Sequence, residues 1–69
     1  MKIVLNGAPR QVDARITVAA LVREIGGGWS DGRGVAVAVD SAVVPRSAWE
    51  EVELAEGQSV EVVGAIQGG

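Results

Sequence analysis

The sequence contains no cysteine and no histidine. Without cysteine the chain cannot build a disulfide framework or a thiolate metal site, and without histidine it lacks the commonest general base and metal ligand. Its 69 residues predict one small domain with little volume for a substrate pocket. We therefore expect a protein that is not an enzyme by itself, with no metal site and no cofactor bound by this chain.

Basic residues are also few: six Lys and Arg stand against nine Asp and Glu, and the net charge is −3. The basic residues are scattered, which disfavours nucleic acid or an anionic membrane as the partner and favours a partner with a basic docking face. The N-terminal apolar stretch is only Ile3-Val4-Leu5, too short for a signal peptide or a membrane span. The expected localisation is cytoplasmic.

The first part of the chain predicts a β-hairpin. Residues 1–5 are apolar and β-branched, as in a strand, and we place this strand near the centre of a sheet. Asn6-Gly7 is the dipeptide most typical of a tight hairpin turn. Because Pro9 has no amide donor, the returning strand, over about residues 10–14, is expected at a sheet edge.

A short amphipathic helix should follow. Thr17 is the expected N-cap, with Ile16 and Leu21 at the two positions of a hydrophobic staple. Apolar residues recur at helical spacing, at Val18, Leu21, Val22 and Ile25. So short a helix needs a sheet to pack against, so we interpret it as a core element rather than a partner-binding helix.

Residues 26–34 form a glycine-rich stretch. Such loops can direct backbone amides at a phosphate group. This stretch lacks the Gly-Lys-Ser/Thr ending of a phosphate-binding loop and precedes a strand instead of a helix. A connecting loop is the favoured interpretation.

The second half predicts three more strands, over residues 35–39, 42–44 and 59–63. Turns are expected at Asp40-Ser41 and at residues 55–58, and Trp49 should pack against the edge of the core. The acidic stretch 50–54 is interpreted as a solvated face with Val52 and Leu54 tucked inward, rather than as a pair of catalytic carboxylates.

The strand over residues 35–39 alternates valine and alanine. If its valines face the helix, Ala36 and Ala38 face the other way and, with Val63, form a smooth uncharged patch on the open side of the sheet. Two interpretations remain: an ordinary monomer surface, or a docking face for a partner.

The predicted order is strand, strand, helix, then three strands and a tail. The right-handed crossover rule places the first and last strands side by side at the centre. The fold class is α+β, a ubiquitin-like β-grasp with a mixed sheet of four to five strands and one helix on one face. We expect a domain over residues 1–64 and an extended, flexible C-terminal tail over residues 65–69.

The whole chain resembles the thiamine-biosynthesis sulfur carriers (ThiS), which end in Gly-Gly. The resemblance rests on Met-Lys-Ile-Val-Leu-Asn-Gly at the start, Thr17-Val18 with Leu21, residues 44–49 (Val-Pro-Arg-Ser-Ala-Trp), residues 56–60 (Glu-Gly-Gln-Ser-Val) and Gln67-Gly68-Gly69. The middle segment is the most specific, because the related molybdopterin-synthase small subunits usually lack it. The glycine-rich stretch departs from the family pattern in a loop that the family varies.

The resemblance implies a function for the C-terminus. An E1-like adenylyltransferase (ThiF-type) would use MgATP to convert the Gly69 carboxylate to an acyl-adenylate. A persulfide donor such as a cysteine desulfurase would supply sulfur to give a thiocarboxylate, and thiazole synthase (ThiG-type) would accept that sulfur. Ile66, Gln67 and Gly68 would thread the partner's active site, where glycine allows close approach.

Other functions remain open on the same residues. The chain could be a carrier for molybdopterin or tRNA thiolation, or a ubiquitin-like modifier that forms an isopeptide bond through Gly69. It could also be an interaction module in which the two glycines, frequent in this chain, are incidental. We expect a monomer when the chain is alone and complexes with its enzyme partners.

Overall fold

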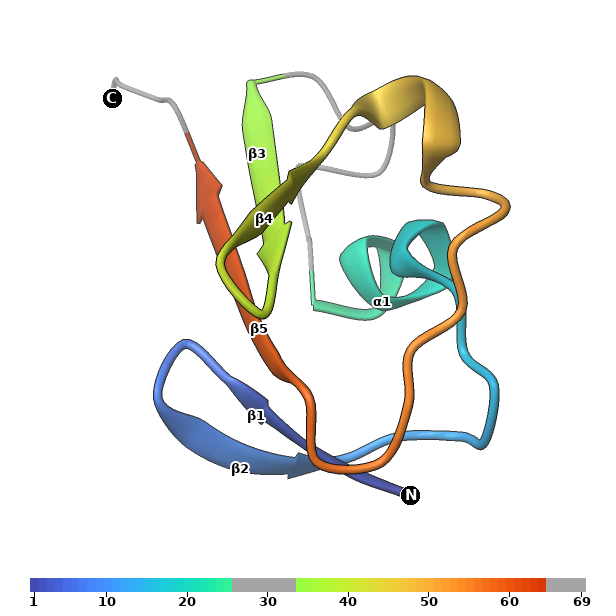
Figure 1. The fold of residues 1–69 in the computed structure, drawn as a ribbon, viewed down its shortest axis with the longest axis vertical. Helices are drawn as coiled ribbons and strands as arrows, with labels where there is room; N and C mark the ends of the chain where they lie inside the picture. Colours follow the sequence, from blue (N-terminus) through green and yellow to red (C-terminus); the bar gives the residue numbers. More distant parts are fainter. Residues whose placement is uncertain (26–33, 65–69) are drawn as a thin grey trace.

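The computed structural model describes residues 1–25 and 34–64, which form a five-stranded mixed sheet with an α-helix on one face (Figure 1). The strands are β1 (Lys2–Leu5), β2 (Ala8–Gln11), β3 (Val35–Val39), β4 (Ala42–Val44) and β5 (Ser59–Gly64). The α-helix α1 spans Val18–Ile25, and a short 3-10 helix, η2, spans Arg46–Ala48. The predicted β-grasp fold is confirmed.

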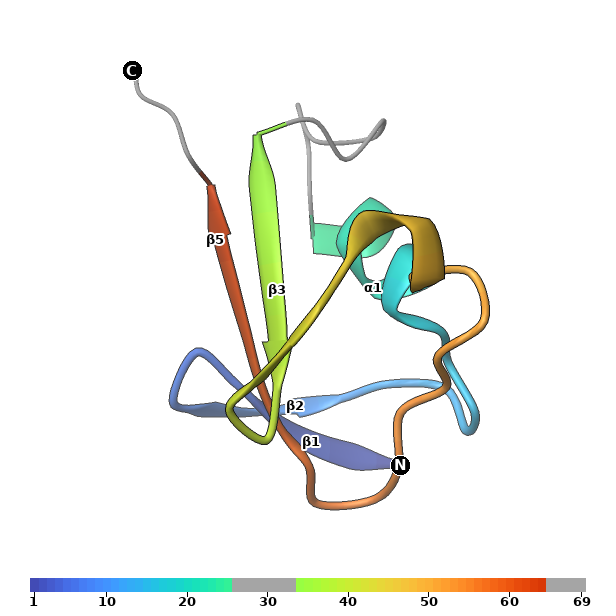
Figure 2. The same cartoon turned by 45° about the horizontal axis from the view of Figure 1, so that its top comes forward.

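The sheet order is β2-β1-β5-β3-β4, so β5 is the central strand. It runs parallel to β1, with Val4 opposite Ser59 and Leu5 opposite Val60, and antiparallel to β3. Figure 2 shows β5 and β3 side by side, with the β1–β2 hairpin beside the beginning of β5. The first and last strands are therefore neighbours, as the crossover rule predicted.

The predicted position of β2 was wrong by about two residues. The strand covers Ala8–Gln11 instead of residues 10–14, and Pro9 lies within it, opposite Val4. Met1 and Val12 exchange two hydrogen bonds, of 3.0 and 2.8 Å, so alternate pairs along this ladder are bonded. The Val4–Pro9 pair falls at a non-bonded place, where the missing amide of proline removes no ladder bond. The prediction of an edge strand is confirmed.

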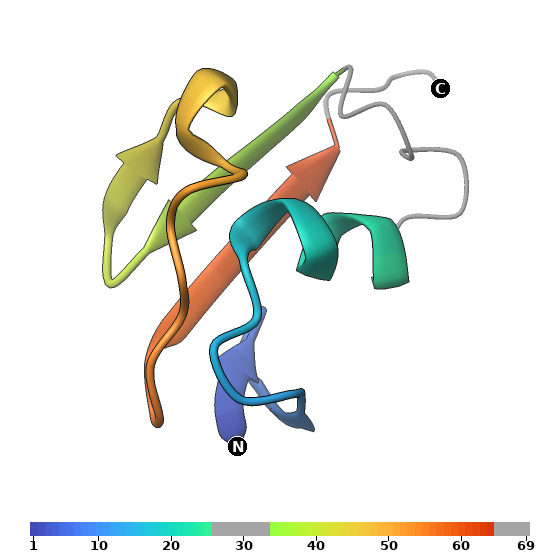
Figure 3. The same cartoon turned by 90° about the vertical axis from the view of Figure 1, so that its right-hand side faces the viewer.

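The first three amides of α1 all have hydrogen-bond acceptors. The Thr17 hydroxyl accepts a 3.1 Å hydrogen bond from the Ala20 amide, as predicted for an N-cap. The amides of the first two helical residues donate to the second half of the chain: Val18 to the Val52 carbonyl at 2.9 Å, and Ala19 to the Trp49 carbonyl at 3.1 Å. These bonds fasten the helix N-terminus to the segment around residues 49–52. Figure 3 shows this part of the chain passing beside the start of α1.

The core lies between α1 and the sheet. The buried side chains of the described residues are all apolar, and the largest fully buried ones are Ile3, Val18, Leu21, Val22, Val37 and Val60. Trp49 is buried at the edge of this core, and its indole nitrogen donates a 2.9 Å hydrogen bond to the Val44 carbonyl. The predicted inward positions of Leu21, Leu54 and Trp49 are confirmed. The glycine-rich stretch lies outside the described residues, apart from Gly34.

Candidate functional site

The predicted site lies at the C-terminal end of β5. The strand ends at Gly64, the last described residue. The predicted tail residues Ile66, Gln67, Gly68 and Gly69 lie outside the described residues. The described part of the site is therefore the end of β5, after which the tail follows in the chain. The residues that bind the backbone of β5 fix the position of this end.

Asn6 holds the end of β5 on its β1 side. Its side-chain amide donates to the Val62 carbonyl at 3.2 Å, and its side-chain oxygen accepts from the Val62 amide at 2.9 Å. The Asn6 backbone amide also donates to the Val60 carbonyl at 2.9 Å. Sequence reasoning found only the turn at Asn6, whose φ of 50° fits that turn. No sequence pattern indicates its contact with a residue 56 positions away.

Asp40 plays a matching part at the beginning of β5. It lies in the β3–β4 turn with a φ of 49°, and its carboxylate accepts hydrogen bonds from the Ser59 amide at 2.9 Å and the Gln58 side chain at 3.2 Å. Two turn residues on opposite sides of β5 therefore bind its backbone, one at each end. Both turns were predicted, but neither side-chain contact was.

The open face of the sheet carries the predicted patch. Ala36 lies opposite Val63 on neighbouring strands, and Ala38 lies opposite Glu61. Ala36 is exposed, Ala38 is half-buried, and Val63 is 59% exposed. The inward position of the β3 valines is confirmed at Val37, which is 1% exposed. The residues meet on one surface as expected.

Two further residues extend this patch. Val43, opposite Ala38 on β4, is 75% exposed, the largest exposure of the large apolar side chains in the described chain. Glu61 is exposed and adds one negative charge beside Ala38. We call these five residues the open-face patch: Ala36, Ala38, Val43, Glu61 and Val63. Sequence reasoning missed Val43 because the strand that carries it has only three residues, too few for an alternation to show.

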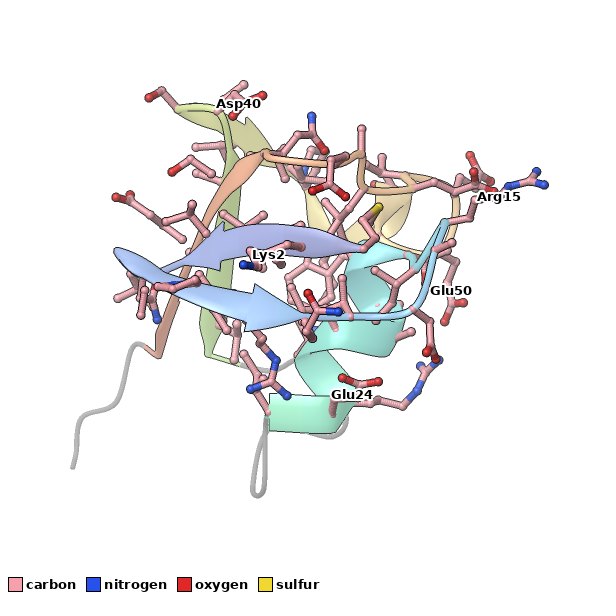
Figure 4. The ribbon with its side chains drawn as sticks, turned by 90° about the horizontal axis from the view of Figure 1, so that it is seen from below. Lys2, Arg15, Glu24, Asp40 and Glu50 are labelled. Carbon is pink, nitrogen blue, oxygen red and sulfur yellow. The ribbon has the colours of Figure 1, made fainter. Side chains whose placement is uncertain are left out.

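The acidic residues outside this patch lie on a solvated surface. Glu50 faces Arg23 at 3.6 Å and Glu53 faces Arg15 at 3.4 Å, and all four side chains are about half exposed or more. Figure 4 shows Arg15 and Glu50 on one side of the molecule, with Glu50 near the helix, and Asp40 on the turn between β3 and β4. The interpretation of the stretch 50–54 as a solvated face is confirmed by its exposed Glu50, Glu51 and Glu53.

The described residues hold no candidate metal site and no candidate membrane span. Within residues 1–25 and 34–64, no three acidic side chains come together as a group that could hold a metal ion. No helix in this part of the chain is long and apolar enough to cross a bilayer.

A sheet of this order with a helix on one face defines a β-grasp domain, and the sequence model of the ThiS family matches residues 3–69. The chain belongs to the ThiS family. A crystal structure of the thiamine biosynthesis protein ThiS from Geobacter metallireducens superposes with a TM-score of 0.79 at 27% identity, over the full length of both chains. A solution structure of a thiamine biosynthesis protein from the same organism gives a TM-score of 0.79 at 25% identity, covering all of this chain and 88% of that one.

A curated relative extends the comparison. The protein called thiazole synthase in Paramagnetospirillum magneticum is 41% identical over all 69 residues of this chain. The chain spans only 20% of the length of that relative.

Proposed function

We propose that this chain carries sulfur as a thiocarboxylate on Gly69 and delivers it for assembly of the thiazole part of thiamine. The match to the ThiS family, which reaches Gly69, is the observation that carries this proposal. The geometry of β5 supports it, because a central strand held on both sides ends five residues before the C-terminus. In this role residues 1–64 are the folded holder and residues 65–69 are the reactive tail.

The chemistry needs activation because a carboxylate is a poor electrophile. An adenylating partner would transfer AMP from MgATP to the Gly69 carboxylate and release pyrophosphate. The terminal sulfur of a persulfide would attack the carbonyl carbon and displace AMP, leaving an acyl disulfide. A second thiol would then attack the sulfur atom that still belongs to the donor. It would form a disulfide with the donor, break the S–S bond and release the thiocarboxylate, with the transferred sulfur on the Gly69 carbon.

The chain itself is a co-substrate in this scheme. It has no cysteine or histidine, so the groups that make and break bonds belong to its partners. MgATP would bind the adenylating partner, and the persulfide would come from a donor such as a cysteine desulfurase. Sulfur could be held only at the C-terminal carbon.

We propose thiazole synthase as the sulfur acceptor. The relative in Paramagnetospirillum magneticum bears that name, and this whole chain matches one fifth of its length. The similarity places a domain like this one within a longer protein of that name. A covalent link of this kind would keep a carrier and its acceptor at high local concentration.

The open-face patch is proposed as the docking face for the adenylating partner. It lies on the strands β3, β4 and β5, of which β5 leads into the tail. A partner bound there would meet the body of the carrier and its tail at once. The patch has four small or aliphatic side chains and one carboxylate. We therefore expect the partner surface that binds it to be apolar and to carry one basic residue.

Deletion of Gly68 and Gly69 tests the proposal. The shortened chain should keep its circular dichroism spectrum and its melting temperature, since the buried core and the strands of the sheet are formed by residues 1–64. Thiocarboxylate formation and sulfur delivery to thiazole synthase should both be lost. Full activity of the folded, shortened chain would exclude the carrier role and leave a plain interaction module. Covalent conjugates of the intact chain to lysine in cell extracts would instead favour a protein modifier.

A further inference from the structure

Asn6 takes the place of a missing strand beside the end of β5. The β1–β5 ladder pairs Val4 with Ser59 and Leu5 with Val60, and β1 then stops. The chain turns away at Asn6-Gly7, while β5 continues to Gly64. On this side the backbone groups of Val62 would lack a strand partner, and the Asn6 side chain binds both of them.

The other side of β5 is held by β3 throughout. Val62 lies opposite Val37, and the pairing continues to Gly64, which lies opposite Val35. A strand end that is hydrogen-bonded to a neighbour on one side only can change its direction by twisting around that neighbour. A strand end that is hydrogen-bonded on both sides has a fixed direction. The Asn6 amide therefore supplies the second restraint within two residues of the end of β5.

We propose that Asn6 is a positioning residue that sets the direction in which β5 leaves the sheet. This inference rests on the proposed function, because that direction decides where the Gly69 carboxylate lies when the carrier has docked. A misdirected tail would leave docking unchanged and make the reactive geometry rarer. The expected defect is therefore in kcat for thiocarboxylate formation and not in KM.

Asp40 offers a matched control. Like Asn6, it lies in a hairpin turn with a positive φ and accepts a 2.9 Å hydrogen bond from a β5 amide. Its bond is to Ser59, at the beginning of β5 and five residues before Gly64. Glycine tolerates a positive φ, so Asn6→Gly and Asp40→Gly both keep the turn backbone and remove side-chain bonds to β5.

The experiment measures steady-state formation of thiocarboxylate with saturating MgATP and persulfide donor, varying the concentration of the carrier. We expect Asn6→Gly to lower kcat about tenfold, equivalent to about 1.4 kcal/mol, with KM changed less than about twofold. Asp40→Gly should keep the wild-type kcat. In the folded variants, the amide order parameter of Gly64 should fall with Asn6→Gly and stay unchanged with Asp40→Gly.

The inference is overturned if Asn6→Gly keeps the wild-type kcat, or if both variants lose kcat equally, since the loss would then follow general stability. A rise in KM alone would also overturn it, because Asn6 would then act in docking. Failure of the wild-type chain to gain sulfur would refute the proposed function itself. If Asn6→Gly does not fold, Asn6→Asp provides the measurement: it keeps the acceptor for the Val62 amide and loses the donor to the Val62 carbonyl. It should lower kcat, and wild-type kcat would overturn the inference.

Discussion

The indole nitrogen of Trp49 donates a 2.9 Å hydrogen bond to the carbonyl of Val44, so the edge strand β4 is held by a side chain from beyond the turn that follows it. The backbone carbonyl of the same tryptophan accepts from Ala19 in the first turn of α1. Trp49 thus connects the outermost strand with the helix. The chain between β4 and β5 has η2 as its only named helix or strand. Trp49 is the buried side chain that attaches this part of the chain to the edge of the core.

Replacement of Trp49 by phenylalanine should destabilise the domain. The change removes the bond to Val44 and leaves a void at a side chain that is only 5% exposed. We expect a loss of about 1–3 kcal/mol in the free energy of unfolding. Urea denaturation followed by circular dichroism measures it. Val43→Ala is the control and should cost less than about 0.5 kcal/mol, because Val43 is 75% exposed. Equal costs for the two variants would contradict this account of Trp49.

Thr17→Ala should weaken the start of α1. The variant loses the acceptor for the Ala20 amide, and we expect about 0.5–2 kcal/mol of destabilisation. Thr17→Ser keeps that oxygen and should recover most of the loss. Chemical denaturation of the three proteins in parallel gives the comparison, and a serine variant as unstable as the alanine variant would show that the hydroxyl is not what matters.

Val63→Asp should weaken docking without unfolding the chain. Val63 is 59% exposed on the open-face patch, so a charge there costs the isolated domain little but must be desolvated against an apolar partner. We expect KM for the adenylating partner to rise about tenfold with kcat unchanged. Arg15→Ala, outside that patch, serves as control. An unaltered KM for Val63→Asp would show that the face is ordinary monomer surface.

Glu61→Gln tests the charge on the same patch. If Glu61 meets a basic residue, its neutral variant should bind the adenylating partner several-fold more weakly at low salt and show a flatter dependence on salt concentration. Binding titrations at two ionic strengths give both quantities. A salt dependence that is the same in wild type and variant would remove Glu61 from the interface.

The sequence allowed the order and the type of the elements to be predicted because these depend on local signals. Thr17 as a cap, the helical spacing of Val18 and Leu21, and the turn residues Asn6 and Asp40 each act within a few positions of the chain. The register of β2 was missed for a physical reason. The sequence predicts a strand that begins after Pro9, because proline has no amide to donate. At a non-bonded place of an edge strand, however, a proline costs no hydrogen bond, and Pro9 lies within β2.

The candidate site was harder to predict because its supports are contacts between distant residues. Asn6 and Val62 are separated by 56 positions, and Asp40 and Ser59 by 19. In both cases the sequence indicates the turn. It does not indicate that the side chain of the turn residue also binds the backbone of β5. The exposed alanines of β3 were predicted from alternation, whereas Val43 became visible only once β4 was paired with β3.

The most direct test of the central claim is the intact mass of the protein before and after incubation with MgATP, the adenylating partner and a persulfide donor. We predict a gain equal to the exchange of one oxygen for one sulfur, assigned by fragmentation to Gly69 and absent when ATP is omitted. An unchanged mass, with enzymes that are shown to act on another carrier, would contradict the sulfur-carrier function.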